Sequence, residues 1–289
     1  MSESPLMDPV RSLAVRRGYE IFPGWTSHFW TWLTGKALPG QRPLVDPGPW
    51  GYLATALVPL AAGSALSAWA VLAAPRWWPA LLVLGWMLAL NGARKLALTC
   101  AHQCAHARFT GDKRLDRAVN QALTILLFTQ DAMTYHHDHT EVHHGAKTFA
   151  TRTDPVLSFI EAQGFHPGMT ARALWRRMWL TLVSPRFHLG YFWSRTRHNL
   201  IVPAPWRRVA GLLYVAAWAA FVLLVHDGWK VALASFVVPV VVLYQIAAFL
   251  ELLCEHDWLR PDEPGLPARM RRATHSLSLI HISEPTRPY

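Results

Sequence analysis

Four long apolar runs constrain the fold of this 289-residue chain more than any other feature. They cover residues 52–74, 77–101, 209–226 and 230–254. Each has about the length that an α-helix needs to cross a bilayer, roughly 20 residues. The alternative is that all four runs pack inside a soluble protein. Only 16% of the residues are charged, against roughly 25% in soluble proteins, so the composition favours four transmembrane helices.

The apolar runs are joined in pairs by short connectors, which predicts two transmembrane hairpins. The largest part outside the runs is residues 102–208, between the hairpins. Within it, residues 171–195 mix tryptophans with arginines that include Arg195. Such a mixture is typical of amphipathic helices that lie on a membrane surface. We therefore expect an all-α membrane protein with four transmembrane helices as two hairpins, plus a cytosolic, interfacial helical cap.

The basic residues predict the orientation of the chain. All but two of the 28 lysines and arginines lie on the same side of the predicted spans, because the hairpin tips carry only Arg76 and Lys230. By the positive-inside rule, that side is the cytosol. Residues 1–50 are then a cytosolic N-terminal segment, and residues 51–275 are the membrane domain. A net charge of +10 also suits nucleic acid. Beside four spans we expect membrane phospholipids, and no nucleic acid, as the partner.

The end of the chain does not continue this pattern. Residues 276–289 read SLSLIHISEPTRPY and resemble a translated sequencing adapter. We expect this segment to be a non-native tail and leave its histidine, His281, out of the predicted site.

A first pair of histidines directly follows the second apolar run. His102 and His106 are four residues apart, so a continuing helix places both imidazoles on one face. A helix from Trp77 to His106 is roughly 45 Å long, which exceeds the ~30 Å hydrocarbon core. We therefore expect the pair just beyond the cytosolic boundary. The spacing alone is equally compatible with metal ligands and with ordinary surface histidines.

A denser cluster occupies residues 136–144, which read HHDHTEVHH. His139 and His143 are again one helical turn apart, and His144 points about a quarter-turn away, where it would serve a second metal ion. A solvated polar turn is the alternative. Five histidines in nine positions favour metal binding. We expect the first two histidines of the segment to lie around the site or on the surface.

The fourth apolar run is followed directly by Glu255-His256-Asp257, at the same predicted depth as the other histidines. Ionisable residues at the end of an apolar helix are costly unless they have a partner or a function. Imidazole suits iron, zinc and copper. The predicted ligands are His102, His106, His139, His143, His144 and His256. Metal-bound imidazoles need acceptors that orient their rings. The candidates are Asp138, Glu141, Asp154 and Glu255.

These histidines resemble the boxes of the membrane fatty acid desaturase and hydroxylase superfamily. That family carries HxxxH or HxxxxH, then HxxHH or HxxxHH, then another HxxHH-like box. His102-Gln-Cys-Ala-His106, with Phe109 shortly behind it, is similar to the first box. His139-Thr-Glu-Val-His143-His144 is similar to the second.

Two further features extend the resemblance over about residues 45–275. Asp154-Pro155 is similar to the Asp-Pro pair that follows the second box, and His256 is similar to an additional histidine at the end of the fourth span. One box is missing. The third would follow Arg269 to His275, where the adapter-like tail begins, so we expect that the chain is truncated there.

The missing box predicts incomplete metal binding. About six ligands remain where the family has eight or more, so we expect the chain as written to bind iron incompletely and to be inactive. Restoring the missing end should raise both the bound iron and the turnover. No gain in either quantity would contradict the expected truncation.

The resemblance implies a centre of two iron ions that uses O2 and two external electrons to remove hydrogen from an unactivated C–H bond. We therefore predict an O2-dependent lipid desaturase that introduces a double bond into a fatty acyl chain. The expected partners are the membrane, the lipid substrate and an electron donor such as a ferredoxin or a cytochrome b5-like protein. Candidates for docking an acidic partner are Arg108, Lys113, Arg114 and Arg117. Their alternative role is only to retain this face in the cytosol.

Two other functions remain open from the sequence. A membrane di-iron hydroxylase of alkanes, lipids or carotenoids would carry the same boxes. A non-enzymatic metal transporter is the more distant alternative, and it should place ligands near the middle of discontinuous spans.

Overall fold

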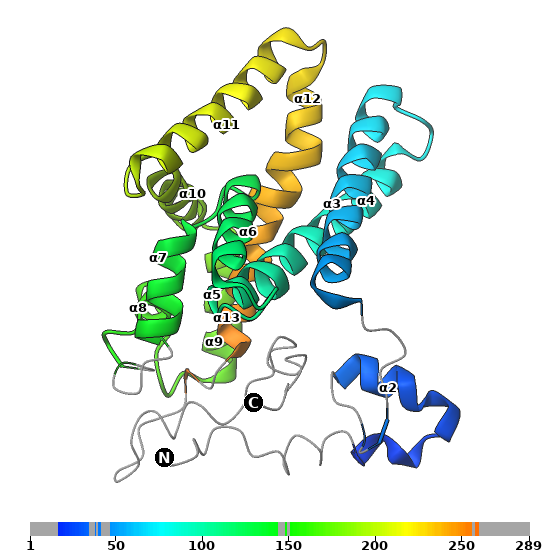
Figure 1. Cartoon of the computed structure of the whole chain (residues 1–289), viewed down its shortest axis with the longest axis vertical. Helices are drawn as coiled ribbons and strands as arrows, with labels where there is room; N and C mark the ends of the chain where they lie inside the picture. Colours follow the sequence, from blue (N-terminus) through cyan, green and yellow to red (C-terminus); the bar gives the residue numbers. More distant parts are fainter. Residues whose placement is uncertain are drawn as a thin grey trace.

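The computed structural model describes residues 17–34, 38, 40–41, 47–143, 148, 151–255 and 258–259, which form helices and no β-strand. The predicted all-α class is confirmed. The N-terminal elements are η1 (Gly18–Ile21), η2 (Gly24–Thr26) and α2 (Ser27–Thr34). The two hairpins and the cap between them follow (Figure 1).

The first hairpin pairs α3 (Gly48–Ala73) with one continuous helix from Trp78 to Ala105. The continuous helix consists of α4 (Trp78–Lys95), the π-helical η3 (Leu96–Ala101) and α5 (His102–Ala105). A proline in the first turn begins α3 and another begins α4, where the missing N–H would have no helical partner anyway. Both helices are long and apolar enough to cross a membrane, which confirms the first two predicted spans.

Three glycines bring α3 and the second span backbone to backbone. A Cβ added to Gly63, Gly85 or Gly92 would lie within 3 Å of backbone atoms of the facing helix. Small residues at such positions let membrane helices approach closely, and the resulting van der Waals contacts hold the helices together without a hydrophobic driving force. Close van der Waals packing between the two helices is therefore the main interaction that holds the first hairpin together.

Replacing Gly92 by leucine should destabilise the protein by about 1–3 kcal/mol or more, because the new side chain would overlap the backbone at Ala56 and Leu60. The measurement is thermal unfolding in detergent. Gly190→Ala is the control, since Gly190 has no atom within 4 Å of its would-be Cβ. This second change should be neutral or stabilising by about 0.5–1 kcal/mol. Equal melting of the two variants would contradict the close approach.

The second hairpin pairs α11 (Pro205–Leu224) with a continuous helix from Gly228 to Cys254. This helix consists of α12 (Gly228–Ala232), the π-helical η5 (Leu233–Leu243) and the main part of α13 (Tyr244–Glu255). Asp227, with a φ of 55°, turns the chain between the two helices. Both are long and apolar enough to span a membrane, as predicted.

Pro239 lies inside the fourth span, and side chains of the first hairpin donate hydrogen bonds to backbone carbonyls near it. Proline has no N–H, so carbonyls four or five residues earlier lose their helical donor. Nε1 of Trp86 donates to the carbonyl of Ala234 at 2.8 Å. Oγ of Ser64 donates to the carbonyl of Ser235 at 3.0 Å. These bonds tie the second hairpin to the first.

The cap between the hairpins is helical, as predicted, and gathers toward the end opposite the hairpin tips (Figure 1). Its elements are α6 (Lys113–Leu126), α7 (Ala132–His136), the π-helical η4 (His137–His143), α8 (Pro155–Ala162), α9 (Ala171–Leu182) and α10 (Pro185–Leu200). Arg207 of α11 links the second hairpin to the cap by hydrogen bonds. Its Nη2 donates to Asn199 at 2.6 Å, and its Nε donates to Gln121 at 3.2 Å.

One arginine of the expected interfacial helices is buried. Residues 171–195 form two helices, α9 and most of α10. Arg195, however, is only 3% exposed and donates to the carbonyl of Val240 at 3.0 Å. Its guanidinium also lies 4.9 Å from the ring centre of Tyr244. The expected interfacial position of Arg195 is therefore wrong, because α10 turns this side chain toward the fourth span.

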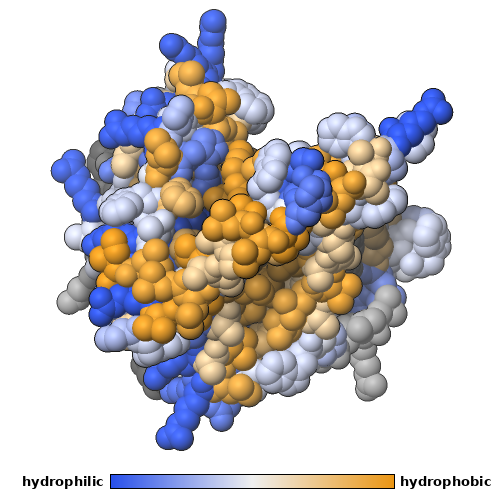
Figure 2. All heavy atoms as spheres, turned by 90° about the horizontal axis from the view of Figure 1, so that it is seen from above, coloured by the Kyte–Doolittle hydropathy of each residue, from blue (hydrophilic) through white to orange (hydrophobic). Residues whose placement is uncertain are grey.

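Large apolar side chains cover the outer surface of the spans. On α11 alone, Leu212, Leu213, Leu223 and Leu224 are each more than half exposed. Figure 2, which views the molecule from the hairpin tips, shows hydrophobic residues across the middle of this end. Apolar surface on this scale would be unfavourable in water and is suited to lipid. The chain is an integral membrane protein.

Candidate metal centre

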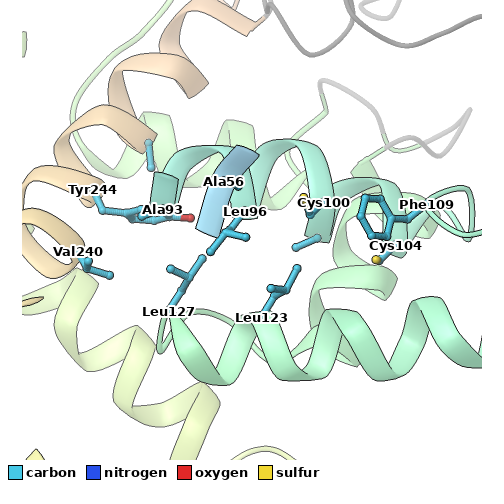
Figure 3. Close-up of a cluster of buried hydrophobic side chains, with 12 residues drawn as sticks. Ala56, Ala93, Leu96, Cys100, Cys104, Phe109, Leu123, Leu127, Val240 and Tyr244 are labelled. Carbon is cyan, nitrogen blue, oxygen red and sulfur yellow. The ribbon is translucent and has the colours of Figure 1, made fainter. Parts of the chain in front are cut away.

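The first histidine pair lies at the end of the second span, next to a buried hydrophobic cluster. Leu96 and Cys100 of η3 belong to one buried cluster with Leu123 of α6 (Figure 3). The helix then continues one more turn and presents His102, which is buried, and His106, which is half-buried. Their ring centroids are 4.9 Å apart. The packing of α6 on the second span thus fixes the position of both rings.

His139 of η4 lies against this pair although it is more than thirty residues away in the chain. Its ring centroid is 4.6 Å from that of His102 and 5.2 Å from that of His106. One ligand nitrogen from each of the three residues lies within 4.8 Å of the other two. Three imidazoles from two separate helices therefore converge closely enough to hold one metal ion.

His143 lies next to this cluster and is held by a buried carboxylate. Its ring centroid is 5.5 Å from that of His139, and its side chain is only 1% exposed. Nδ1 of His143 is 3.1 Å from Oδ2 of Asp154, which is fully buried. An Nδ1–H that donates to a carboxylate leaves Nε2 as the ligand nitrogen of the ring. This pair has the arrangement found around metal-bound histidines.

Replacing Asp154 by asparagine should weaken metal binding by about 10–100-fold, because the neutral amide orients the ring of His143 less strongly. Asp154 is also the N-cap of α8. Asparagine is an equally good cap, so folding should change little. The measurement is metal retention against a competing chelator, with the exposed Glu161→Gln of the same helix as the control. Unchanged retention in the Asp154 variant would exclude the orienting role.

Tyr135 and His136, the last two residues of α7, contact the first histidine pair and the helix that carries it. The hydroxyl of Tyr135 is 3.3 Å from Nδ1 of His102, and its ring stacks on His139 with centroids 5.1 Å apart. Nδ1 of His136 lies 2.6 Å from the carbonyl of Ala105, which links α7 to α5. Tyr135 is not among the residues predicted to orient the imidazoles, because all the predicted partners are carboxylates. Its position one turn before His139 was the available signal.

Two other predicted acidic partners, Asp138 and Glu141, pair with residues outside the histidine cluster. Asp138 accepts a hydrogen bond from Nε2 of Gln130 at 2.7 Å. Glu141 is about 59% exposed and pairs with the similarly exposed His137 at 2.8 Å. Glu141 thus pairs with a surface histidine instead of an imidazole of the cluster.

Several predicted site residues lie outside the described part of the chain. They are His144, His256 and the side chain of Glu255, together with the tail at residues 276–289. The predictions for them are unchanged. Trp258, which is described, lies beside the site, with its ring centroid 6.0 Å from that of His143. The end of the fourth span therefore does approach the histidine cluster.

The donor set fits a transition metal. Neutral imidazoles bind iron, zinc and copper, whereas magnesium and calcium prefer oxygen ligands. His102, His139 and His143 are all buried, so a metal held by them would be largely protected from water. The burial and the nitrogen ligands together suit iron as well as the other two metals.

The fold and the site together define a class: a four-span helical membrane protein whose cap brings histidines together at one end of the spans. Comparison with protein-family models matches residues 75–281, more than half of the chain, to the family described as fatty acid desaturase. The chain belongs to the fatty acid desaturase family, which implies an oxidoreductase. No curated protein and no solved structure matches the chain.

Proposed function

We propose that this protein is an O2-dependent di-iron lipid desaturase that introduces a double bond into a fatty acyl chain. The single observation that carries the proposal is the convergence of His102, His106 and His139 within 4.8 Å in a member of this family. The apolar spans next to the cluster suit a substrate that is itself a long hydrocarbon.

The described residues would hold the metal as follows. His102, His106 and His139 supply one nitrogen each, and His143 is the fourth ligand, oriented by Asp154. His144 and His256 are the remaining proposed ligands. When bound, two iron ions would supply the oxidation of an unactivated C–H bond with O2 and two external electrons. The chain's own task is to orient the imidazoles, exclude water and place the acyl chain.

The proposed location of the site is the cytosolic face, because the basic residues lie at this end of the spans. An acidic electron donor, such as a ferredoxin or a cytochrome b5-like protein, would approach the same basic face. A metal transporter fits the positions of the described histidines less well than a desaturase does. The described spans contain a histidine only at the end of the second one, His102, whereas transport sites lie near mid-depth.

Lipid profiling tests the proposed reaction. The form with the third histidine box restored is expressed in a host, and its lipids are compared by mass spectrometry with those of the His139→Ala/His143→Ala variant. A desaturase should give acyl chains lighter by two hydrogen atoms, which the double variant should not make. His137→Ala, in the same segment but exposed, should retain the product. Equal product from the double variant would remove the cluster from the reaction.

The same experiment separates desaturation from hydroxylation. The family and the histidine cluster suit both reactions, because each begins with removal of hydrogen from carbon. A product heavier by one oxygen atom would assign the protein as a hydroxylase and contradict the proposed desaturase.

A further inference from the structure

A groove of about 550 Å³ lies between the tips of the two hairpins, where α3, α4 and α12 are labelled in Figure 1. The first hairpin supplies one wall, and the beginning of the fourth span supplies the other. The lining includes Ala70, Val71, Trp86, Leu233, Ala234 and Val238. Because several of these side chains are small, the two walls leave a space between the hairpins, at the end of the molecule opposite the imidazole cluster.

The distance from the histidines separates this groove from the proposed reaction. Along the continuous helix from Trp78 to Ala105, Trp86 and His102 are roughly 24 Å apart at 1.5 Å per residue. One leaflet accounts for about 15 Å of the ~30 Å hydrocarbon core, and a lipid acyl chain spans about one leaflet. A fatty acyl chain whose reacting carbon lies at the histidines would therefore not reach the groove.

The chemistry of the lining does not suit water. Among the described lining residues, Lys230 is the only charged one, and its Nζ pairs with Asp227 at 2.9 Å. Nε1 of Trp86 donates to the carbonyl of Ala234 at 2.8 Å. The other lining residues are alanine, valine, leucine and tryptophan. Water needs two or more polar partners to enter a cavity, and apolar cavities stay dry, so the groove is suited to a hydrocarbon occupant.

The size of the groove distinguishes a lipid chain from a partner helix. An α-helix with its side chains is about 10–12 Å across and rises 5.4 Å per turn, so one turn occupies roughly 400–600 Å³. The whole groove has about the volume of that single turn, whereas a transmembrane partner needs about 20 residues. A single acyl chain is much thinner than a helix, so the groove favours the acyl chain.

We propose that this groove binds one acyl chain of a bilayer phospholipid, from the leaflet at the hairpin tips. Trp78 and Trp229 line the groove and are each about half exposed. Tryptophan favours the boundary between hydrocarbon and headgroups, so these two residues place the mouth of the groove where a phospholipid chain begins. The bound chain contacts both hairpins and fills the space between them. The site goes beyond the proposed function, because its occupant is not the substrate.

Photochemical labelling of the full chain in vesicles tests this proposal. The vesicles consist of phosphatidylcholine with a small fraction of phosphatidylcholine whose acyl chain carries a diazirine. Exchange with excess unlabelled phosphatidylcholine before illumination removes the lipid that exchanges freely. Mass spectrometry of the peptides should then find the label on Val71 and Leu233, which line the groove. It should find none on Leu212 and Leu223 of α11, which are exposed outside the groove.

Val238→Phe should lower the exchange-resistant label by about tenfold, because the added ring overfills the groove. Val238 is half-buried and lines the groove. Leu213→Phe is the matched control and should keep the label, since Leu213 is 66% exposed on α11 and does not line the groove. Val71→Phe fills the groove from the other hairpin, and it decides the question if thermal unfolding shows that Val238→Phe does not fold.

Three results would overturn the proposal. The first is label that is absent from Val71 and Leu233, or that exchanges from them as fast as from α11, as boundary lipid does. The second is equal label in Val238→Phe and Leu213→Phe, which would place the acyl chain outside the groove. The third is label that continues from the groove to the residues around Cys100, which would make the groove part of a path to the histidines.

Iron content separates this proposal from the proposed function. Val238→Phe and Val71→Phe should both keep the bound iron of the parent chain, because they lie at the opposite end of the spans from the imidazole cluster. A chain stripped of iron should still retain the labelled lipid in the groove. Retention of the lipid in a protein that proves not to be a desaturase would leave the groove assignment intact.

Discussion

Replacing His139 by alanine should abolish stable metal binding, whereas replacing His137 should leave it unchanged. His139 is the only member of the three-imidazole group that comes from η4, and its ring lies close to both His102 and His106. Its loss leaves the three-imidazole group with two nitrogens, both from the end of the second span, and His143 is not among the three residues whose ligand atoms lie within 4.8 Å of one another. Removal of an outer partner alone typically costs 10–100-fold in metal affinity, so removal of a direct ligand should cost more. The measurement is iron bound per chain after purification.

His137→Ala is a demanding control because it lies only two residues away in the same π-helical segment. His137 is exposed and pairs with Glu141 on the surface. Both variants lose one imidazole, so any general effect of histidine number should appear in both. Iron loss of similar size in the two variants would contradict the site described here. A loss confined to His139→Ala would support it.

The second large effect concerns the ion pair between Arg94 of the second span and Glu251 of the fourth. Both side chains are largely buried, and Arg94 also lies over the ring of Tyr244, 4.9 Å from its centre. Glu251→Gln would leave the guanidinium without its counter-charge in an apolar setting. We expect a loss of about 3–5 kcal/mol, because an unpaired buried charge costs far more than the pair contributes. The measurement is the unfolding midpoint in detergent.

Two further variants check the cause. The double change Arg94→Met and Glu251→Leu removes both charges and should recover most of the lost stability. Asp227→Asn breaks the ion pair of Asp227 with Lys230 at the exposed tip of the second hairpin, where solvent screens the charges, so the midpoint should change little. A double variant no more stable than Glu251→Gln would show that the charge itself is not the cause.

Much of the architecture was predictable because it depends on local composition. Length and apolarity alone identify the four spans, since a bilayer imposes a minimum helix length. The spacing of His102 and His106 places both rings on one helical face. The same spacing places the rings of His139 and His143 on one helical face of the second histidine segment. A carboxylate partner was expected from metal chemistry, and Asp154 lies against His143 as such a partner would.

Other features were decided by contacts between distant segments. The π-helical turns η3 and η4 lie at the two histidine segments, and residue spacing does not distinguish them from ordinary α-helix. Glu141 was as plausible a partner as Asp154 in the sequence, yet it faces solvent. Arg195 belongs to a segment whose basic and aromatic composition predicts a helix on the membrane surface. It is nevertheless buried and donates a hydrogen bond to the carbonyl of Val240.

The sequence by itself determined that this chain has four membrane-spanning helices and carries its histidine segments at or beyond one end of the spans, because helix length and residue spacing are local properties. Only the tertiary structure decided which histidines meet and which charge pairs with Arg94. Those outcomes depend on how α6, η4 and the fourth span pack against the second span, and such packing is set by contacts between residues far apart in the chain.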